Sequence, residues 1–284
     1  MANSIALRKQ YSTLLDEVYK MASLTAILDG PNEMVREGAN ANEILIPKLD
    51  MQGLATYNKS TGYVAGDVTL TYETKKCEYD RGRMFTVDSV DDQETAGIAF
   101  GRLSGEFLRT KVVPELDAYR FGQYASKSGI GGATGALSTG ANALAALRVG
   151  RTAIENAEAN VENCYLFINP AILGLIDDLD TTASRKALEG WAGIVKVPSS
   201  RFFKTVTLAA SGAGGFSGAT AINFLIVAKD AVIQYQKHSV SKIITPEANQ
   251  DADAWKFGYR TVGIAEVYDN KLAGIYAHTA AAGN

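Results

Sequence analysis

The chain has 284 residues, a length near the point where one hydrophobic core stops growing, so we expect one large domain or two lobes that share elements. Hydrophobic residues make up 46% and charged residues 21%, a composition that excludes wholesale disorder. The net charge of -3 at pH 7 provides no basic field for a nucleic-acid backbone, which argues against a dedicated nucleic-acid binder.

The N-terminal stretch lacks the apolar core of a signal peptide, and no run approaches the ~18 apolar residues that span a bilayer. We therefore expect no membrane association and a protein that stays in the compartment where it is made. Cys77 and Cys164 are the only cysteines, too few for a disulfide framework or a thiolate zinc site. Two isolated thiols in a reducing cytoplasm are predicted.

Residues 1–42 are typical of an arm more than of a domain. A helical pattern runs from about Ser12 to Leu28 and ends at the turn signal Asp29-Gly30-Pro31-Asn32. The apolar face of this helix needs cover from elsewhere. Its apolar positions are Leu14, Leu15, Val18, Tyr19 and Met21.

Between Glu43 and Thr74 the hydrophobic period changes to two, which predicts a long hairpin with turn chemistry at Gly62–Asp67. A lone hairpin is marginally stable in water because no second layer covers its better face. We therefore expect it to rest on another molecule, with hairpin and arm mobile in a free subunit and fixed in an assembly. The alternating positions are Ile44, Ile46, Leu49, Val68, Leu70, Tyr72 and Thr74.

The clearest helix signal follows Asp88. Ser89 can cap it, acidic residues complement its dipole, and an apolar stripe continues to about Ala125, ~50 Å at 1.5 Å per residue. Pro114 is predicted to kink or divide this helix, because its ring displaces the carbonyl four residues before it. Gly97, Gly101 and Gly105 predict a flat stripe that a strand or helix can approach closely.

After a loop rich in Gly and Ser, from Ser126 to Gly140, the pattern becomes mixed α/β. Ala209–Thr220 also has the composition of a flexible loop. We expect helices at Ala141–Ala159 and Ala171–Leu179, and strands at Cys164–Ile168, Gly193–Val197, Ala221–Ala228, Val240–Ile244 and Trp255–Val267, with Leu272–Ala277 returning after the turn Asp269-Asn270.

Several short patterns imitate catalytic motifs. The glycine loop Ser128–Gly135 lacks the third glycine of a dinucleotide fingerprint and the Gly-Lys-Ser/Thr of a phosphate-binding loop, so a flexible connector is favoured. Ser239 and Lys242 match the S-x-x-K spacing, but residues three apart in a strand face opposite ways. Neither pattern therefore predicts an active site.

Metal-binding patterns fail in the same way. Asn249, Asp251 and Asp253 imitate the start of a calcium loop, but the expected glycine and bidentate carboxylate do not follow. His238 and His278 stand alone in the sequence, without a second ligand at metal-binding spacing. We predict no catalytic, cofactor-binding or metal-ligating residue.

The segment Tyr72–Asp88 combines a cysteine with several carboxylates and cations. Two lysines precede the thiol and could lower its pKa, but no histidine and no helix N-terminus lies nearby. Strand alternation also disperses the charges, so we predict a strand whose charged faces meet neighbours. One face carries Lys75, Cys77 and Tyr79, and the other carries Lys76, Glu78 and Asp80.

The order of elements resembles the major capsid protein of tailed bacteriophages, the Hong Kong 97-type fold. The resemblance is carried by the arm, the hairpin, YDRGRMFTV (Tyr79–Val87), the long helix, CYLFINPAILGLIDDL (Cys164–Leu179) and WKFGYRTVGIAEV (Trp255–Val267). It implies an α+β fold with an N-terminal arm at 1–42, an extended loop (E-loop) hairpin at 43–75, a peripheral (P) domain at 76–127 and 251–267, and an axial (A) domain at 128–250 and 268–284.

The resemblance also implies a function without catalysis: a structural subunit that assembles into pentamers and hexamers of an icosahedral head around double-stranded DNA. It places the chain in the virion, and in the host cytoplasm during assembly. Because only a short arm precedes the hairpin, it implies a separate scaffolding protein or none. A portal protein and decoration proteins are the other expected partners, and DNA would be contacted non-specifically if at all.

Two alternatives stay open: a nanocompartment shell of the same fold, and a cytoplasmic α/β enzyme acting around Ser126–Gly140. For a shell subunit, Arg81 and Arg83 beside Asp80 are the preferred inter-subunit ion-pair residues, because arginine forks bind carboxylates bidentately. A pair within the subunit or a solvated pair is the alternative. The full set of expected contact residues is Lys59, Lys75, Glu78, Asp80, Arg81 and Arg83.

Overall fold

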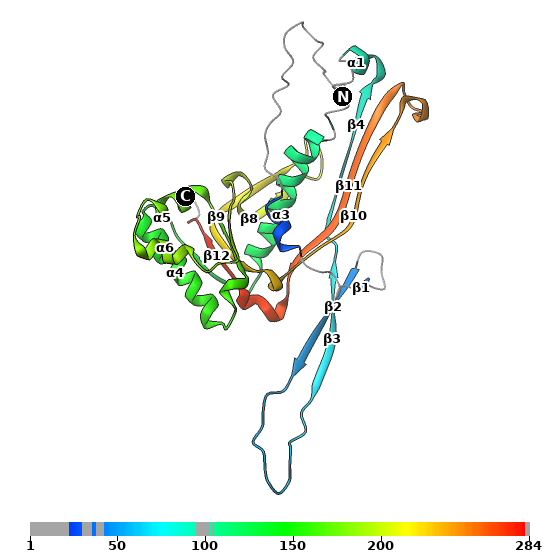
Figure 1. The fold of residues 1–284 in the computed structure, drawn as a ribbon. Helices are drawn as coiled ribbons and strands as arrows, with labels where there is room; N and C mark the ends of the chain where they lie inside the picture. Colours follow the sequence, from blue (N-terminus) through cyan, green and yellow to red (C-terminus); the bar gives the residue numbers. More distant parts are fainter. Residues whose placement is uncertain (1–22, 30–35, 38–42, 95–102, 104, 282–284) are drawn as a thin grey trace.

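The fold was analysed in a computed structural model that describes residues 23–29, 36–37, 43–94, 103 and 105–281. These residues form three sheets, accompanied by helices (Figure 1). Most of the helix expected at Ser12–Leu28 lies outside the described residues, and its described end is a single 3-10 turn, η1 (Ala26–Leu28). Gly97 and Gly101 of the predicted glycine stripe also lie outside them.

The hairpin forms the first sheet, in the order β1-β2-β3. Strand β1 (Arg36–Glu37) pairs with β2 (Glu43–Met51), which pairs antiparallel with β3 (Val68–Lys76) along its whole length. Beyond these strands, a bridge between Asn58 and Gly62 closes the tip. The predicted hairpin is thus confirmed, except that its tip turn is at Asn58–Gly62 and not at Gly62–Asp67, and it projects away from the rest of the chain (Figure 1).

The second sheet has the order β10-β11-β4. Strand β4 (Tyr79–Asp88) pairs antiparallel with β11 (Ala254–Val267), and β11 pairs antiparallel with β10 (Val232–Ile244). The strand expected at Val240–Ile244 is therefore longer and begins at Val232. Because β10 pairs with β11, the sheet that contains β4 includes residues before the predicted boundary at 251.

Two separate parts of the long helix expected after Asp88 are described. Helix α1 (Ser89–Glu94) follows β4, and α3 (Val113–Ser126) is preceded directly by a π-helical stretch, η3 (Leu108–Val112), whereas residues 95–102 and 104 lie outside the described residues. Pro114 lies in the first turn of α3. Its missing N–H and bulky ring remove one α-helical hydrogen bond to the preceding turn, which explains why the wider π-helical turn falls there.

The third sheet contains six strands and most of the core. Its order is β5-β12-β9-β6-β7, and a further strand, β8, pairs with β9. Three helices lie together beside this sheet (Figure 1). The elements are β5 (Gly131–Thr134), α4 (Gly140–Asn156), β6 (Cys164–Ile168), α5 (Pro170–Asp177), α6 (Thr182–Leu188), β7 (Gly193–Lys196), β8 (Phe203–Leu208), β9 (Phe216–Ala228) and β12 (Ile275–Thr279).

Two expected loops contain strands. The glycine-rich connector Ser126–Gly140 includes β5, which pairs in parallel with β12. A Cβ on Gly131 would lie 2.9 Å from Tyr276 Cδ2, and one on Gly132 would lie 2.9 Å from the Ala277 carbonyl oxygen. The glycines therefore permit a close strand approach, which their composition alone does not distinguish from flexibility.

The structure also contains strands and a helix that the sequence did not predict. Part of the expected loop Ala209–Thr220 belongs to β9, whose partner β8 was not predicted. Helix α6, begun by a capping box at Thr181, was not predicted either. Leu272–Ala277 does not return along β11: after the 3-10 segment η8 (Asp269–Gly274), β12 enters the third sheet beside β9.

Candidate assembly site

The hairpin exposes an apolar face. Cross-strand partners share a face of an antiparallel pair, and here Leu49 lies opposite Leu70 and Met51 opposite Val68. These four residues are 51%, 55%, 61% and 69% exposed. Asp50 and Thr69 occupy the opposite, polar face. A sheet face of this kind normally packs against a second layer, and the described chain provides none.

The tip of the hairpin is an ordered turn. Gly62 has a φ of +78°, and its N–H donates to the Asn58 carbonyl at 2.7 Å. The rings of Tyr57 and Tyr63 meet edge to face with centroids 4.9 Å apart. Lys59, one of the expected contact residues, is exposed in this turn. The hairpin therefore places an ammonium group at its end, beside exposed aromatic rings.

The base of the hairpin is fixed to the second sheet. Lys75 Nζ lies 3.8 Å from Glu266 Oε2, which also accepts a hydrogen bond from Lys127 Nζ at 3.1 Å. Cys77 is buried in a small cluster with Ile233, Val262 and Ile264. Burial raises the pKa of the Cys77 thiol, in keeping with its packing in this cluster. Lys75, expected to contact a neighbouring subunit, thus has an intrachain partner.

The charges along β4 also meet partners within the chain. Arg260 donates to both carboxylate oxygens of Asp80, at 2.9 and 2.7 Å, and this pair lies on the exposed face of the sheet. The hydrogen bond from the Arg260 guanidinium lowers the pKa of Asp80. Arg81 pairs with Glu115 of α3, with Nε 2.7 Å from Oε1. Asp80 and Arg81 therefore have ion-pair partners within the chain, and their contact with a neighbouring copy stays a prediction.

Arg83 and Glu78 complete the expected set. Arg83 Nη1 donates to the Gly212 carbonyl at 3.0 Å, and its side chain is exposed. Glu78 is exposed on the face opposite Cys77 and Tyr79, as the alternation predicts. The structure thus brings Asp80, Arg81 and Arg83 to one strand but gives each a different partner.

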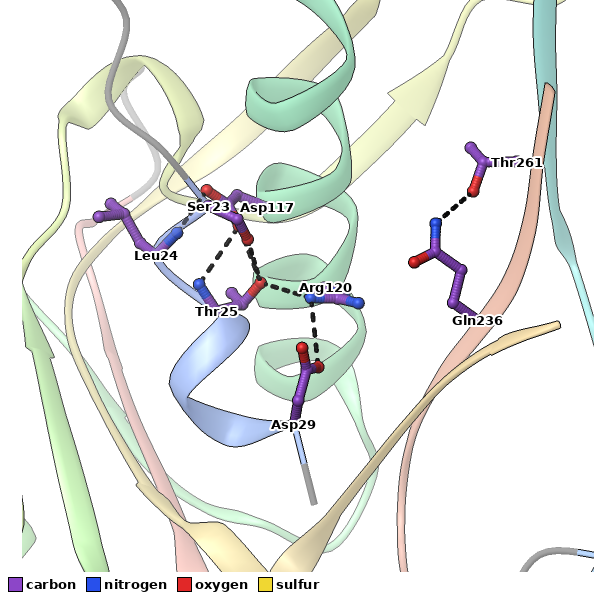
Figure 2. Close-up of polar contacts among 8 residues, drawn as sticks. All are labelled: Ser23, Leu24, Thr25, Asp29, Asp117, Arg120, Gln236 and Thr261. Atoms are coloured by element: carbon purple, nitrogen blue, oxygen red, sulfur yellow. Dashed lines mark hydrogen bonds and ion pairs between the residues drawn. The ribbon is translucent and has the colours of Figure 1, made fainter. Parts of the chain in front are cut away.

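A buried carboxylate holds the segment before the hairpin. Asp117 of α3 is fully buried and accepts hydrogen bonds from Ser23 Oγ at 2.8 Å, Leu24 N at 2.9 Å, Thr25 Oγ1 at 2.8 Å and Thr25 N at 3.3 Å (Figure 2). Arg201 Nη1 donates at 2.9 Å to Asp117 Oδ2, the oxygen that also accepts from Leu24 N. Asp117 therefore caps the N-terminal side of η1 and binds it to α3.

Arg120 lies one turn further along α3 and completes this contact. Its Nη1 donates to Thr25 Oγ1 at 2.9 Å and lies 3.7 Å from Asp29 Oδ1 (Figure 2). Leu28 is buried in the main core. We call the contact among Ser23–Asp29, Asp117, Arg120 and Arg201 the clasp. Within the predicted arm at 1–42, the described segment Ser23–Asp29 thus packs on the folded body.

Sequence reasoning missed the clasp, although the sequence carries a signal for it. Asp117, Arg120, Phe121 and Tyr124 follow the spacing of one helix face, and all four are buried. A charged residue at apolar-stripe positions predicts a buried ionic partner. That partner, Arg201, lies 84 residues away, and only the fold brings the two together.

The residues of the rejected motifs have structural roles. His278 is buried, stacks on Phe224 with centroids 5.1 Å apart, and accepts at Nδ1 from Asn223 Nδ2 at 3.0 Å when its proton is on Nε2. Burial lowers the pKa of His278. Asn249 closes its turn by accepting from Asp251 N at 3.2 Å. Within the described ranges, no three His, Cys, Asp or Glu residues group as a metal site requires.

In the glycine-rich connector, Gly131 and Gly132 are in β5, and Asn223 Nδ2 donates to the carbonyl of Gly135, directly after this strand, at 3.1 Å. Among the described helices, none combines the length and apolar character needed to cross a membrane.

Sequence comparisons give no relative: no protein-family model and no curated protein matches the chain. Solved structures do match. A chain from Mycobacterium phage Che8 superposes with a TM-score of 0.67 at 12% identity, over 98% of both chains. The mature capsid of bacteriophage PhiM1 gives a TM-score of 0.67 at 12% identity, over 99% of this chain and 92% of that one. The capsid of cyanophage P-SCSP1u gives 0.64 at 14% identity, over 96% and 94%.

These matches show the fold. The chain has the α+β architecture of phage capsid proteins, the Hong Kong 97-type fold that its order of elements predicts. A virus-like particle from Pyrococcus furiosus matches less completely, with a TM-score of 0.51 at 14% identity over 81% of this chain and 86% of that chain. The fold of this chain is thus similar both to phage capsids and to the Pyrococcus furiosus particle.

Proposed function

We propose that this chain is the structural subunit of a closed protein shell, the major capsid protein of a phage head in which pentamers and hexamers enclose double-stranded DNA. The observation that carries the proposal is the exposed apolar face of the hairpin, Leu49, Met51, Val68 and Leu70, on a chain whose whole fold matches phage capsids. In this assignment the hairpin is the E-loop, the sheet β10-β11-β4 belongs to the P domain, and the six-stranded sheet belongs to the A domain.

The partner of the hairpin in this proposal is a second copy of the chain. A subunit related to its neighbours by rotation presents one surface to a different surface of the next copy, and closure of the ring repeats this contact. Each contact can be weak, because many engage together and the first raises the effective concentration for the rest. Lys59 at the tip and Glu78 near the base are the expected contact residues that keep exposed charges for such a neighbour.

A nanocompartment shell is the second candidate, supported by the likeness to the Pyrococcus furiosus particle. The phage head is favoured because the match to the PhiM1 capsid spans more of both chains and has the higher TM-score. Scaffolding, portal and decoration proteins are the further partners of a phage head. DNA contact would be non-specific, since the net charge of -3 provides no basic field. No catalytic step is part of the proposal.

Electron microscopy of the expressed protein tests the proposal directly. We expect closed particles; protein that stays a monomer of 30.3 kDa under all assembly conditions contradicts it. Nuclease-protected DNA inside particles from infected cells separates a phage head from a nanocompartment, which would enclose protein. Amide hydrogen exchange adds a local readout: residues 43–74 should gain protection on assembly, and equal protection in subunit and shell would count against the proposed contact.

A further inference from the structure

One guanidinium group joins three elements near the centre of the chain. Arg81 of β4 donates from Nε to Glu115 Oε1 at 2.7 Å and from Nη2 to Glu115 Oε2 at 3.3 Å, which binds it to α3. The same side chain donates from Nη1 to the Ala209 carbonyl at 2.6 Å and from Nη2 to the Gly215 carbonyl at 3.3 Å. Ala209 and Gly215 are the two ends of the loop between β8 and β9, so Arg81 fixes the base of this loop.

The loop itself is built from glycine. Gly212, Gly214 and Gly215 have φ values of +70°, +71° and +84°, a conformation that other residues rarely adopt. Arg83, two residues after Arg81, donates to the Gly212 carbonyl at 3.0 Å. Both arginines therefore hold backbone carbonyls of a segment whose shape depends on glycine, and no side chain of the loop is needed for the contact.

The two arginines and the loop belong to different sheets. Arg81 and Arg83 are in β4 of the sheet β10-β11-β4, whereas β9 continues from the loop into the six-stranded sheet. A groove of about 870 Å³ lies between the two sheets near the loop. It is lined by Phe85, Phe107, Phe216 and Tyr259 among others. Beside this groove, guanidinium groups bridge the two sheets, whereas elsewhere Tyr79 of β4 and Ala265 and Val267 of β11 belong to the main core that includes the six-stranded sheet.

We propose that Arg81, Arg83 and the loop 209–215 form a brace that sets the angle between the two sheets, and that the glycines let this angle vary between copies of the chain. The proposal rests on the proposed shell function: pentamers and hexamers place one sequence in surroundings of different curvature, so the subunit needs a deformable joint. Hydrogen bonds from a guanidinium to carbonyls tolerate such a change, since the donors form a broad fork and the acceptors are on a flexible backbone.

The test uses the unassembled subunit with two spin labels. The natural cysteines are both buried, so labels at Val149→Cys on α4 and Ile243→Cys on β10, which replace exposed side chains, can be attached selectively. Their distance distribution, measured by electron paramagnetic resonance, reports the separation of the two sheets. In the variant Arg81→Lys with Arg83→Gln we expect a broader distribution, because the lysine keeps a charge beside Glu115 but loses the fork.

Arg260→Lys is the matched control, because Arg260 forms an equally bidentate pair in the same sheet but does not contact the loop. It should leave the distance distribution unchanged. Exchange of the amides in 209–216 should rise by about tenfold in the double variant, as hydrogen bonds to charged donors are lost. A double variant with the wild-type distance distribution overturns the brace.

Shell assembly separates this inference from the function on which it rests. If the brace sets curvature, the double variant forms particles with a wider range of diameters than the wild type. Variant particles of unchanged diameter overturn the brace and leave the shell function intact, whereas a wild-type chain that forms no closed particle contradicts the shell function. Should Arg81→Lys fail to fold, Arg83→Gln alone, at an exposed position, must still broaden the distance distribution.

Discussion

Two regions on the N-terminal side of the chain differ in how their apolar and polar groups are covered. The segment Ser23–Asp29 and the hairpin β2–β3 both precede the body in sequence, and the sequence predicts both as extensions that need cover. In the structure, Leu28 and Thr25 are buried and Asp117 accepts four hydrogen bonds from Ser23–Thr25. The hairpin instead leaves Leu49, Met51, Val68 and Leu70 exposed.

The difference shows that the body of the fold, and not the extension, decides which segment docks. Helix α3 offers a buried carboxylate and a guanidinium in successive turns, which satisfy the free N–H groups and hydroxyls of the clasp segment. The described body offers no such surface to the hairpin's apolar face. Ser23–Asp29 is therefore part of the subunit, and the hairpin is the region that another copy would cover in the proposed shell.

The largest expected effect comes from Asp117→Asn, because it removes the charge that compensates Arg201, whose side chain is 3% exposed. Breaking one partner of a buried pair costs ~3–5 kcal/mol, so the free energy of unfolding of the subunit should fall by about that amount. Urea denaturation of the unassembled protein measures it. Asp50→Asn, on the exposed hairpin, is the control and should change the free energy by less than ~0.5 kcal/mol. Equal effects of the two substitutions would contradict the distinction drawn between the regions.

A substitution on the apolar face of the hairpin should impair assembly and leave the stability of the subunit nearly unchanged. Leu70→Lys places a charge on the apolar face, where a neighbouring copy would have to desolvate it, so the yield of particles should fall on the order of tenfold or more. Subunit stability should hardly change, because Leu70 is 55% exposed. Thr69→Lys is the matched control on the polar face, next along the same strand. Particle yields from both variants, measured by sedimentation, should differ; the same loss in both would refute a face-specific contact.

Cysteine reactivity probes the junction between the hairpin and the second sheet. Cys77 lies where the hairpin joins the second sheet, and burial raises the pKa of its thiol. Burial also raises the pKa of Cys164 to about 11, so at pH 8 only about one molecule in a thousand carries that thiolate. Thiol titration of the folded subunit at pH 8 should therefore be slow for both, and complete after denaturation. Rapid reaction of Cys77 alone would mean that the base of the hairpin opens.

Local pattern in the sequence predicts the elements whose shape depends on near neighbours. The strand Cys164–Ile168 has the predicted bounds, and the alternation around Cys77 places Cys77 and Tyr79 inward with Glu78 and Asp80 outward. Strand β5 was missed for the opposite reason: its glycines signal flexibility unless the close approach of Tyr276 is known. That approach is set by residues more than 140 positions away in the chain.

The same limit applies to the candidate site. Charges on β4 were identified as pairing residues, yet their partners depend on which strand lies beside β4 and in which register. Arg260 reaches Asp80 because β11 pairs with β4, at a separation of 180 residues. Arg81 reaches Glu115 because α3 packs near that strand. The sequence alone identifies a charged residue that needs a partner, but the pairing and register of the strands determine which residue that partner is.

The smallest expected effect distinguishes the two carboxylates of the clasp. Burial raises the pKa of Asp29, and the nearby Arg120 only partly offsets it. The folded state therefore binds the proton of Asp29 more tightly than the unfolded chain does, so this group's contribution to stability is present below its unfolded pKa of ~3.9 and is lost as pH rises through the higher folded value. Asp29→Asn should slightly raise the urea midpoint at pH 7. At pH 3 it should leave the midpoint unchanged, because protonated Asp29 and the asparagine that replaces it are both neutral. A lower midpoint at pH 7 would instead show that the contact with Arg120 outweighs desolvation, so that Asp29, like Asp117, holds the segment by charge.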